Sequence, residues 1–144
     1  MSNALRWSEE QLAAHLRGKA APVPALTEIA KTIPTATGSL RDTGMNKTEV
    51  EYAALLQGRA ERGDIAWWKY EAVTLKLADN TRYTPDFMVM RFDGSLEVHE
   101  TKGGFIREDG WLKLKLAASM FPFRFFLCQK ANRKDGGGWS IKRV

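Results

Sequence analysis

The chain has 144 residues, of which 44% are hydrophobic, and this is enough for one compact core but too little for two ordinary domains. Its net charge is +5. The single Cys128 excludes an intramolecular disulfide and a thiolate metal cluster, and no apolar run approaches the ~20 residues of a membrane span. With no continuous apolar signal region at the N-terminus, we expect a soluble, cytoplasmic protein in which Cys128 is a small buried hydrophobe.

The positive charge is concentrated in the last third of the chain. Residues 1–100 hold 12 Lys and Arg against 14 Asp and Glu, whereas residues 101–144 hold 10 against 3. Such a segment favours nucleic-acid binding through phosphate contacts and counterion release. Solvated lysines alone would give the same count, so the charge by itself is a weak indication.

The first 44 residues are predicted to form an arm outside the compact domain. A capping box that starts at Ser8 predicts a short helix over 9–17. Residues 19–44 are rich in Ala, Pro, Thr, Gly and Ser, which is typical of a linker. The arm either packs loosely on its own domain or embraces a second subunit or DNA. The compact domain is expected over 45–144.

This domain is predicted to be α/β with a mixed sheet. Asn46 caps the first helix and Gly63 ends it, and Asp79-Asn80 marks a turn between two strand-like runs. The stretch DGWLKLKLAASMF alternates as a strand would, but LAASM favours a helix. The expected elements are a helix over 47–62, strands over 67–78, 81–91 and 95–102, a helix over 109–121, a strand over 123–130, and a loop and final strand over 136–144.

The stretch TPDFMVMRFDGSLEVHETK places acids at the ends of two adjacent strands. A two-residue turn at its Asp-Gly pair would put Asp86 and Glu100 on opposite faces of the sheet. A three-residue loop with a left-handed Gly94 pairs Arg91 with Ser95 instead. Counting back then sets Asp86 directly opposite Glu100.

The face that carries these acids continues into apolar residues in this second register. Met88 lies opposite Val98 and Met90 opposite Leu96, so this is predicted to be the core side of the hairpin. Lys102 projects from the same face because side chains alternate with period two. His99 projects from the other face and is expected to be a packed sheet histidine rather than a general base.

Two facing carboxylates on an apolar sheet face repel each other and lose hydration. A divalent cation resolves this conflict, since Mg²⁺ binds one or two carboxylates together with phosphate oxygens and water. Lys102 would then hold or polarise the attacking water. The alternative without a metal ion is a solvated sheet edge at which the acids and Lys102 simply pair with one another.

These residues resemble a known family. A helix carrying Glu49, then Pro85-Asp86, then Glu100-Thr101-Lys102 resembles the PD-(D/E)xK nuclease superfamily, and the resemblance runs from Met45 to Gln129. It implies a restriction-endonuclease-like core of a helix, three strands, a helix and a strand. The stretches NKTEVEYA, LADNTRYTPDF and VHETKG are most similar to small phage-encoded proteins near the endonuclease I type of Holliday-junction resolvase.

The resemblance implies a role for each matching residue. Asp86, Glu100 and the backbone carbonyl of Thr101 would bind Mg²⁺, for which Mn²⁺ is expected to substitute, and Lys102 would orient the nucleophilic water. Glu49 would be the upstream acid, acting as a second-metal ligand or through a water. Glu51 is its competitor, and the role of Glu49 in a capping box with Asn46 is a purely structural alternative.

The resemblance also implies partners, namely DNA and a second copy of the chain, since two strands require two cuts. One rival is a non-catalytic DNA-binding or packaging accessory protein that keeps the fold. Another is a sequence-specific restriction or transposition nuclease, which would need a larger recognition surface. The candidate phosphate contacts are Arg107, Lys113, Lys115, Lys130, Arg133 and Lys134; Lys113 and Lys115 face opposite sides of the predicted helix, so only one of them is expected to touch DNA.

Overall fold

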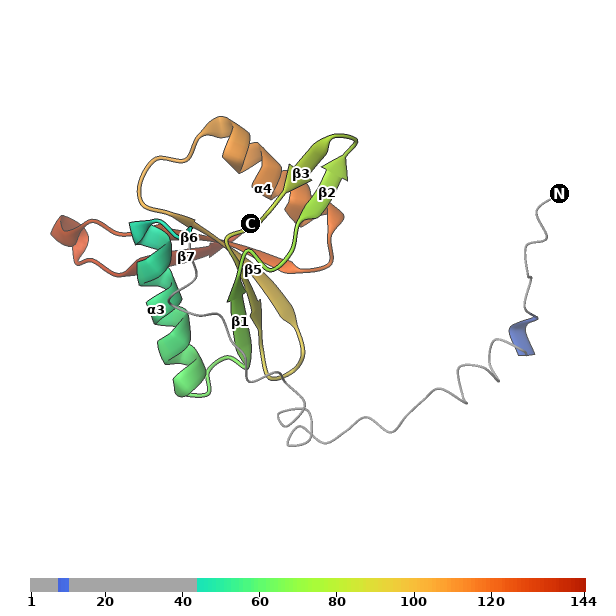
Figure 1. Cartoon of the computed structure of the whole chain (residues 1–144), viewed down its shortest axis with the longest axis horizontal. Helices are drawn as coiled ribbons and strands as arrows, with labels where there is room; N and C mark the ends of the chain where they lie inside the picture. The colour runs from blue at the N-terminus through green and yellow to red at the C-terminus, as the bar shows by residue number, and fades with distance from the viewer. Residues whose placement is uncertain (1–7, 11–43) are drawn as a thin grey trace.

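The structure is a computed structural model that describes residues 8–10 and 44–144 (Figure 1). The linker and nearly all of the helix predicted over 9–17 lie outside the described residues. In chain order the described domain contains α3 (Lys47–Glu61), β1 (Trp67–Tyr70), β2 (Leu75–Ala78), β3 (Thr81–Tyr83), β4 (Phe87–Met90), β5 (Leu96–Lys102), α4 (Glu108–Met120), β6 (Arg124–Lys130), the 3-10 helix η1 (Arg133–Asp135) and β7 (Trp139–Arg143).

The strands form one mixed sheet and one small hairpin. The five-stranded sheet has the order β1-β4-β5-β6-β7, and β2 pairs with β3 in a separate antiparallel sheet. Only β5 and β6 are parallel, and α4 makes the crossover that a parallel pair requires. The prediction of an α/β domain with a mixed sheet is therefore confirmed.

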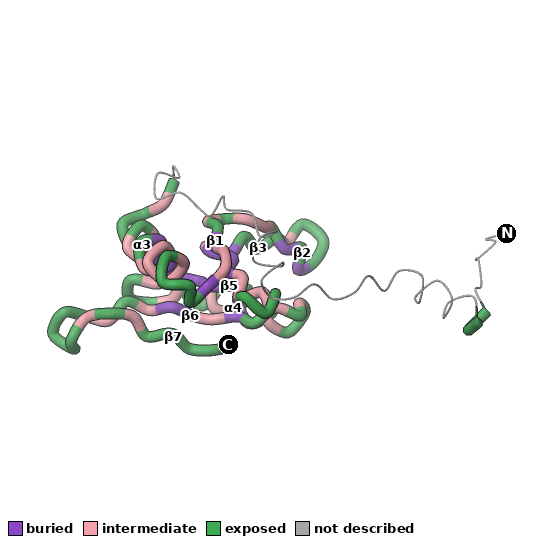
Figure 2. Tube along the Cα trace, turned by 90° about the horizontal axis from the view of Figure 1, so that it is seen from below, coloured by how far each residue is buried: buried purple, intermediate pink, exposed green. Residues whose placement is uncertain are grey.

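The two helices cover opposite faces of the sheet (Figures 1 and 2). The segment over 109–121 is indeed helical, and α4 buries Leu114 and Ala117 against one face. On the other face, α3 buries Tyr52 and Leu56. Within residues 8–10 and 44–144, no helix is both long enough and apolar enough to cross a membrane.

Two predicted strands are each broken in two, so the expectation of three strands before α4 is wrong. The run over 67–78 breaks after β1, where Glu71 has a positive φ of 43° that an extended strand cannot contain. The run over 81–91 breaks at Thr84-Pro85, because proline has no N–H to donate to the hydrogen bonds between strands. The two inner pieces, β2 and β3, pair with each other across Asn80, whose φ is 59°.

The turn between β4 and β5 is the three-residue loop. The N–H of Arg91 donates to the carbonyl of Ser95 at 3.0 Å, and the N–H of Gly94 donates back to Arg91 at 3.0 Å. Gly94 has a φ of +82°. The resulting register pairs Phe87 with His99 and continues through the strand, as predicted from the sequence.

Gly94→Ala is expected to destabilise the domain by about 1 kcal/mol, because a side chain disfavours the left-handed conformation that this loop needs. The space around Gly94 is open, so the cost comes from the backbone alone. Gly110→Ala is the matched control, since Gly110 lies in α4 with open space around it and alanine there should stabilise the helix by up to about 1 kcal/mol. Chemical denaturation measures both; equal free energies of unfolding for the two variants would contradict the assigned turn.

Candidate functional site

The predicted acids meet where β4 begins and β5 approaches its end. Carrying the Phe87–His99 register one residue further sets Asp86 opposite Glu100. Glu100 is only 8% exposed, and the face it shares with Val98 packs against α4. The carboxylate pair therefore lies at the margin of a hydrophobic core.

Asp86 is held by the partner strand. Its Oδ2 accepts hydrogen bonds from the backbone N–H and the side-chain hydroxyl of Thr101, both at 2.8 Å. In residues 8–10 and 44–144 no buried side-chain oxygen or nitrogen lacks a hydrogen-bond partner. Both of these hydrogen bonds end on Oδ2, so they leave the lone pairs of Oδ1 for a ligand.

Glu100 is held on both of its oxygens. The Tyr83 hydroxyl donates to Oε2 at 2.7 Å, and Lys102 Nζ donates to Oε1 at 2.8 Å. Tyr83 is the last residue of β3, so the small hairpin braces a carboxylate of the main sheet. Burial, together with the neighbouring Glu100 carboxylate, raises the pKa of Tyr83 and keeps its hydroxyl a donor.

The two adjacent acids shift the pKa values of the site. Burial and then the charge of Glu100 raise the pKa of Asp86 from 3.8 to about 7, although the hydrogen bonds from Thr101 act in the opposite direction. Burial lowers the pKa of Lys102, but the hydrogen bond and charge of Glu100 outweigh burial, and the net shift is upward. Lys102 is therefore a cation that partly neutralises the pair.

Glu49 and Glu51 point to different surroundings. Glu49 Oε2 accepts the N–H of Asn46 at 2.8 Å, in the capping box of α3, and the hydroxyl of Tyr70 at 3.1 Å. Its charge is the smallest of those that raise the pKa of Lys102. Glu51 instead forms an ion pair with Lys130 at the end of β6.

The donor set suits a hard cation with few protein ligands. Within the described ranges, no three His, Cys, Asp or Glu side chains form a group that could hold a metal ion, so Glu49 does not join Asp86 and Glu100. Two carboxylates and few other protein ligands fit Mg²⁺, which rarely binds in an all-protein cage and takes water and phosphate oxygens as its other ligands. Thr101 lies beside the pair through its N–H and hydroxyl, and its carbonyl remains a predicted ligand.

His99 lies in the other core, as its position in the strand predicts. It is 1% exposed, one ring nitrogen bonds the Tyr52 hydroxyl at 2.7 Å, and the other bonds Glu97 at 3.1 Å. Cys128 Sγ lies 3.1 Å from the same hydroxyl and is fully buried. Both residues are packed components of the core on the α3 side.

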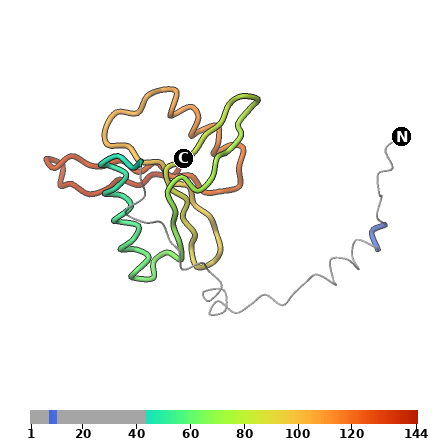
Figure 3. Tube along the Cα trace, in the orientation of Figure 1, coloured from blue at the N-terminus to red at the C-terminus, as the bar shows by residue number. Residues whose placement is uncertain are grey.

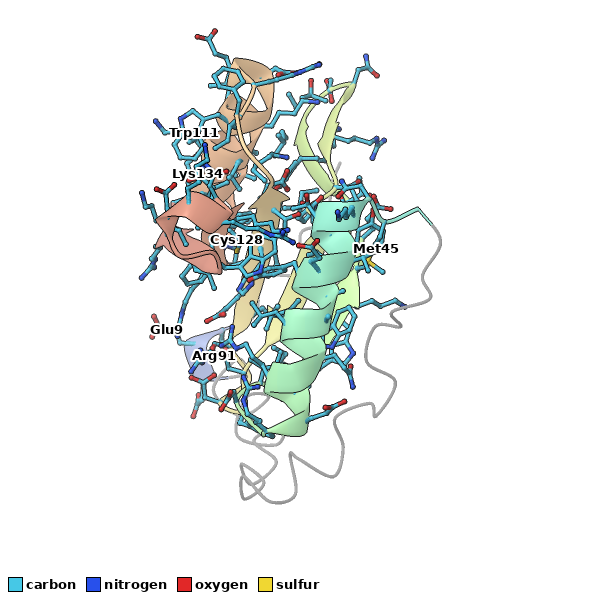
Figure 4. The ribbon with its side chains drawn as sticks, turned by 90° about the vertical axis from the view of Figure 1, so that its left-hand side faces the viewer. Glu9, Met45, Arg91, Trp111, Cys128 and Lys134 are labelled. Atoms are coloured by element: carbon cyan, nitrogen blue, oxygen red, sulfur yellow. The ribbon has the colours of Figure 1, made fainter. Side chains whose placement is uncertain are left out.

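The predicted phosphate contacts are all exposed, but they divide into two groups. Arg107, Lys113 and Lys115 belong to the start and the outer surface of α4, where Lys115 Nζ lies 5.5 Å from the centre of the Trp111 ring. Lys130, Arg133 and Lys134 lie at the end of β6 and in η1. Figure 4 shows Lys134 at that turn, to one side of α3.

Three neighbours of the site were not predicted from the sequence. Tyr83 and Tyr70, which bind Glu100 and Glu49, come from strands whose breaks the alternation pattern did not reveal. Lys47 lies at the start of α3 beside Lys130 and Arg133. The only signals available were the proline before Asp86 and the basic residue next to the capping asparagine.

Comparison of the chain with protein-family models, with curated proteins and with solved structures found no significant match. The resemblance to the PD-(D/E)xK superfamily therefore remains a prediction. A function for this chain is therefore inferred from the geometry of Asp86, Glu100 and Lys102.

Asp86→Asn is expected to stabilise the protein in metal-free buffer at about pH 8 while preserving an acceptor for Thr101. The pKa of Asp86 is raised on folding, so the folded state binds the proton more tightly, and wild-type stability falls as the pH rises from about 4 to above 7. The variant lacks this fall. Thermal unfolding in EDTA should give it a melting temperature higher by about 4 °C or more at about pH 8, with the advantage shrinking as the pH falls and lost below about pH 4.

Adding Mg²⁺ in the same experiment should raise the melting temperature of the wild type and not that of Asp86→Asn, because binding to the folded state alone stabilises it. Asp79→Asn serves as the control, since Asp79 is an exposed acid that pairs with Lys76. If Asp86→Asn is less stable than the wild type in EDTA at about pH 8, the charges of Asp86 and Glu100 do not destabilise the folded protein and the prediction is wrong.

Proposed function

We propose that this chain is a Mg²⁺-dependent DNA endonuclease that hydrolyses phosphodiester bonds. The observation that supports it most directly is the convergence of Asp86, Glu100 and Lys102 at adjacent strand ends, with both hydrogen bonds from Thr101 on a single Asp86 oxygen. Facing acids at the edge of a core have no structural benefit that apolar residues would not supply better. A role that needs negative charge accounts for them.

In this proposal the chain's own residues hold and orient the reacting groups. Thr101 fixes the Asp86 carboxylate and Tyr83 fixes Glu100, so neither side chain has to rearrange when a ligand arrives. Lys102 remains protonated beside Glu100 and can donate a hydrogen bond to a water or to a phosphate oxygen. Glu49 adds a further negative charge from the first turn of α3.

Asp86 and Glu100 would hold the metal ion, with the Thr101 carbonyl as the third protein ligand of the proposal. When bound, Mg²⁺ would supply positive charge that neutralises the phosphate and lowers the pKa of its water. The site fits this ion because its two carboxylates leave the other coordination positions to water and substrate.

The proposed core is restriction-endonuclease-like, and the proposed substrate is branched DNA cut by a homodimer. Within the described domain a helix precedes a hairpin of the main sheet, and α4 then leads into a strand parallel to β5. Counted in the main sheet alone, β1, β4 and β5 come between α3 and α4, and this order supports the proposed arrangement. The junction substrate and the dimer rest on the resemblance and on the need for two cuts.

A second candidate is a DNA-binding or packaging protein without catalytic activity. It is favoured by two observations. Lys102 already pairs with Glu100, and no third carboxylate in the described residues completes a metal cluster. Such a protein would bind DNA with a steep salt dependence and would release no cleaved product. Cleavage is therefore the measurement that separates the two.

The wild type is expected to nick a supercoiled plasmid in Mg²⁺, and Asp86→Ala, Glu100→Gln and Lys102→Ala are each expected to lower the rate by about 100-fold or more, since each removes a ligand or a proton donor. Lys76→Ala and Asp79→Asn are matched controls because this exposed ion pair lies on the β2–β3 hairpin, away from the acids. Full activity in Asp86→Ala or Lys102→Ala would refute the nuclease.

The same assay separates a resolvase from a general nuclease. Cleavage of a four-way junction is compared with cleavage of a linear duplex that has the same arms. Preference for the junction supports a structure-specific enzyme, and equal rates refute that part of the proposal while leaving the nuclease intact.

Glu49→Gln and Glu51→Gln should differ in activity although they make the same chemical change two residues apart. Glutamine at position 49 can still accept the Asn46 N–H of the capping box, so the helix should remain, but the negative charge near Lys102 is lost. We expect about a 10-fold to 100-fold lower cleavage rate for Glu49→Gln and no loss for Glu51→Gln. Melting temperatures check folding; the reverse order of rates would assign the upstream acid to Glu51.

A further inference from the structure

A basic cavity lies at the end of β5, directly after Lys102, and its lining includes neither acid of the carboxylate pair. Its volume is about 320 Å³, and it opens between the start of α3, the chain leaving β5, and the corner from β6 into η1. Figure 3 shows the start of α3 in teal close to the red segment that holds this corner. Its polar and charged lining consists of Lys47, Thr48, Lys130, Asn132 and Arg133, with Gly103 contributing backbone.

The cavity combines three cations with two uncharged groups that can donate hydrogen bonds. Glu51 opposes them through its ion pair with Lys130, and no acid is among the residues that line the cavity. That hydrogen bond from Lys130 is the main cause of the lowered pKa of Glu51, which burial opposes, and the charges of Lys47 and Arg133 add to it. The three cations therefore act on the same small region, which retains an excess of positive charge.

The cavity is tied to the acids by the packing of α3 on β5. Gly103 directly follows Lys102, and a side-chain carbon at Gly103 would come within 2.9 Å of Thr48 Oγ1. The first turn of α3 therefore rests on the backbone at the point where β5 ends. Lys102 also pairs in register with Gln129, the residue before Lys130, so the cavity and the acids share one end of the two parallel strands.

We propose that this cavity binds a backbone phosphate of the DNA strand that crosses the carboxylate pair, next to the phosphate that is cleaved. The inference rests on the proposed function. A strand whose scissile phosphate lies at Asp86 and Glu100 carries a further phosphate one nucleotide along, and the cavity offers Arg and Lys donors to it. Phosphate contacts of this kind fix the register of a strand, so the cavity would decide which bond reaches the acids.

The test measures binding without cleavage. A fluorescein-labelled four-way DNA junction is prepared with single uncharged methylphosphonate linkages at successive positions, and its affinity is measured by anisotropy in EDTA. For the wild type, one linkage should lower the affinity by about tenfold, as expected for the loss of one hydrogen-bonded charge pair. Arg133→Gln and Lys47→Gln should bind the unmodified junction more weakly and should lose no further affinity at that linkage.

Lys134→Gln is the matched control, because Lys134 lies in the same 3-10 turn as Arg133 but does not line the cavity (Figure 4). It should remain as sensitive to the modified linkage as the wild type, because non-additive effects are expected only between groups in contact. Thermal unfolding confirms that each variant is folded. Equal sensitivity of Arg133→Gln and the wild type at every position, or no sensitive position at all, would overturn the inference.

A second arm distinguishes a backbone phosphate from a terminal one. Linear duplexes with 5′-phosphate and 5′-hydroxyl ends are compared for the wild type and Arg133→Gln. A preference for the 5′-phosphate that disappears in Arg133→Gln would assign the cavity to strand ends and overturn the backbone proposal. Cleavage in Mg²⁺ is measured separately. If Arg133→Gln loses its sensitivity to the modified linkage but the wild type cleaves no DNA, only the nuclease proposal is refuted. If the wild type cleaves DNA but Arg133→Gln keeps that sensitivity, only the cavity proposal is refuted.

Discussion

The opposition of Asp86 and Glu100 is the constraint around which this end of the domain is arranged. Two carboxylates on neighbouring strand ends, one of them almost buried, repel each other unless hydrogen bonds and positive charge oppose the repulsion. Thr101, Tyr83 and Lys102 supply both. Part of the conflict remains, since the pKa of Asp86 stays well above its ordinary value. Relief of this residual repulsion is what would draw the proposed Mg²⁺ to the pair.

The supports of the pair depend on irregularities in the chain. Had residues 67–78 and 81–91 formed continuous strands, Tyr83 would have extended the main sheet. The break at Thr84-Pro85 instead lets β3 pair with β2 in a separate hairpin, from which the hydroxyl of Tyr83 reaches Glu100. The strand prediction thus failed where the chain departs from regular pairing to brace the acids, as is common at sites that local propensity alone does not determine.

The parts of the site that could be predicted follow from local rules. Period-two alternation and the left-handed glycine at position 94 fix which side chains share a face, and the Asn46 box fixes the start of α3. The contacts of Tyr83 and Lys47 depend on how separate elements approach each other in space. No periodicity encodes that approach, because it is set by the packing of two cores on the two faces of the sheet.

The first turn of α3 divides three consecutive residues between two tasks. Successive helical residues point about 100° apart, so Lys47 and Thr48 line the basic cavity whereas Glu49 reaches toward Tyr70. One rigid, doubly capped turn therefore fixes a negative charge near Lys102 and positive charge beside the end of β5. In the proposed enzyme this would set the spacing between the phosphate that is held and the phosphate that is cut. Because that turn rests on the backbone of Gly103, a side chain there would disturb both tasks at once.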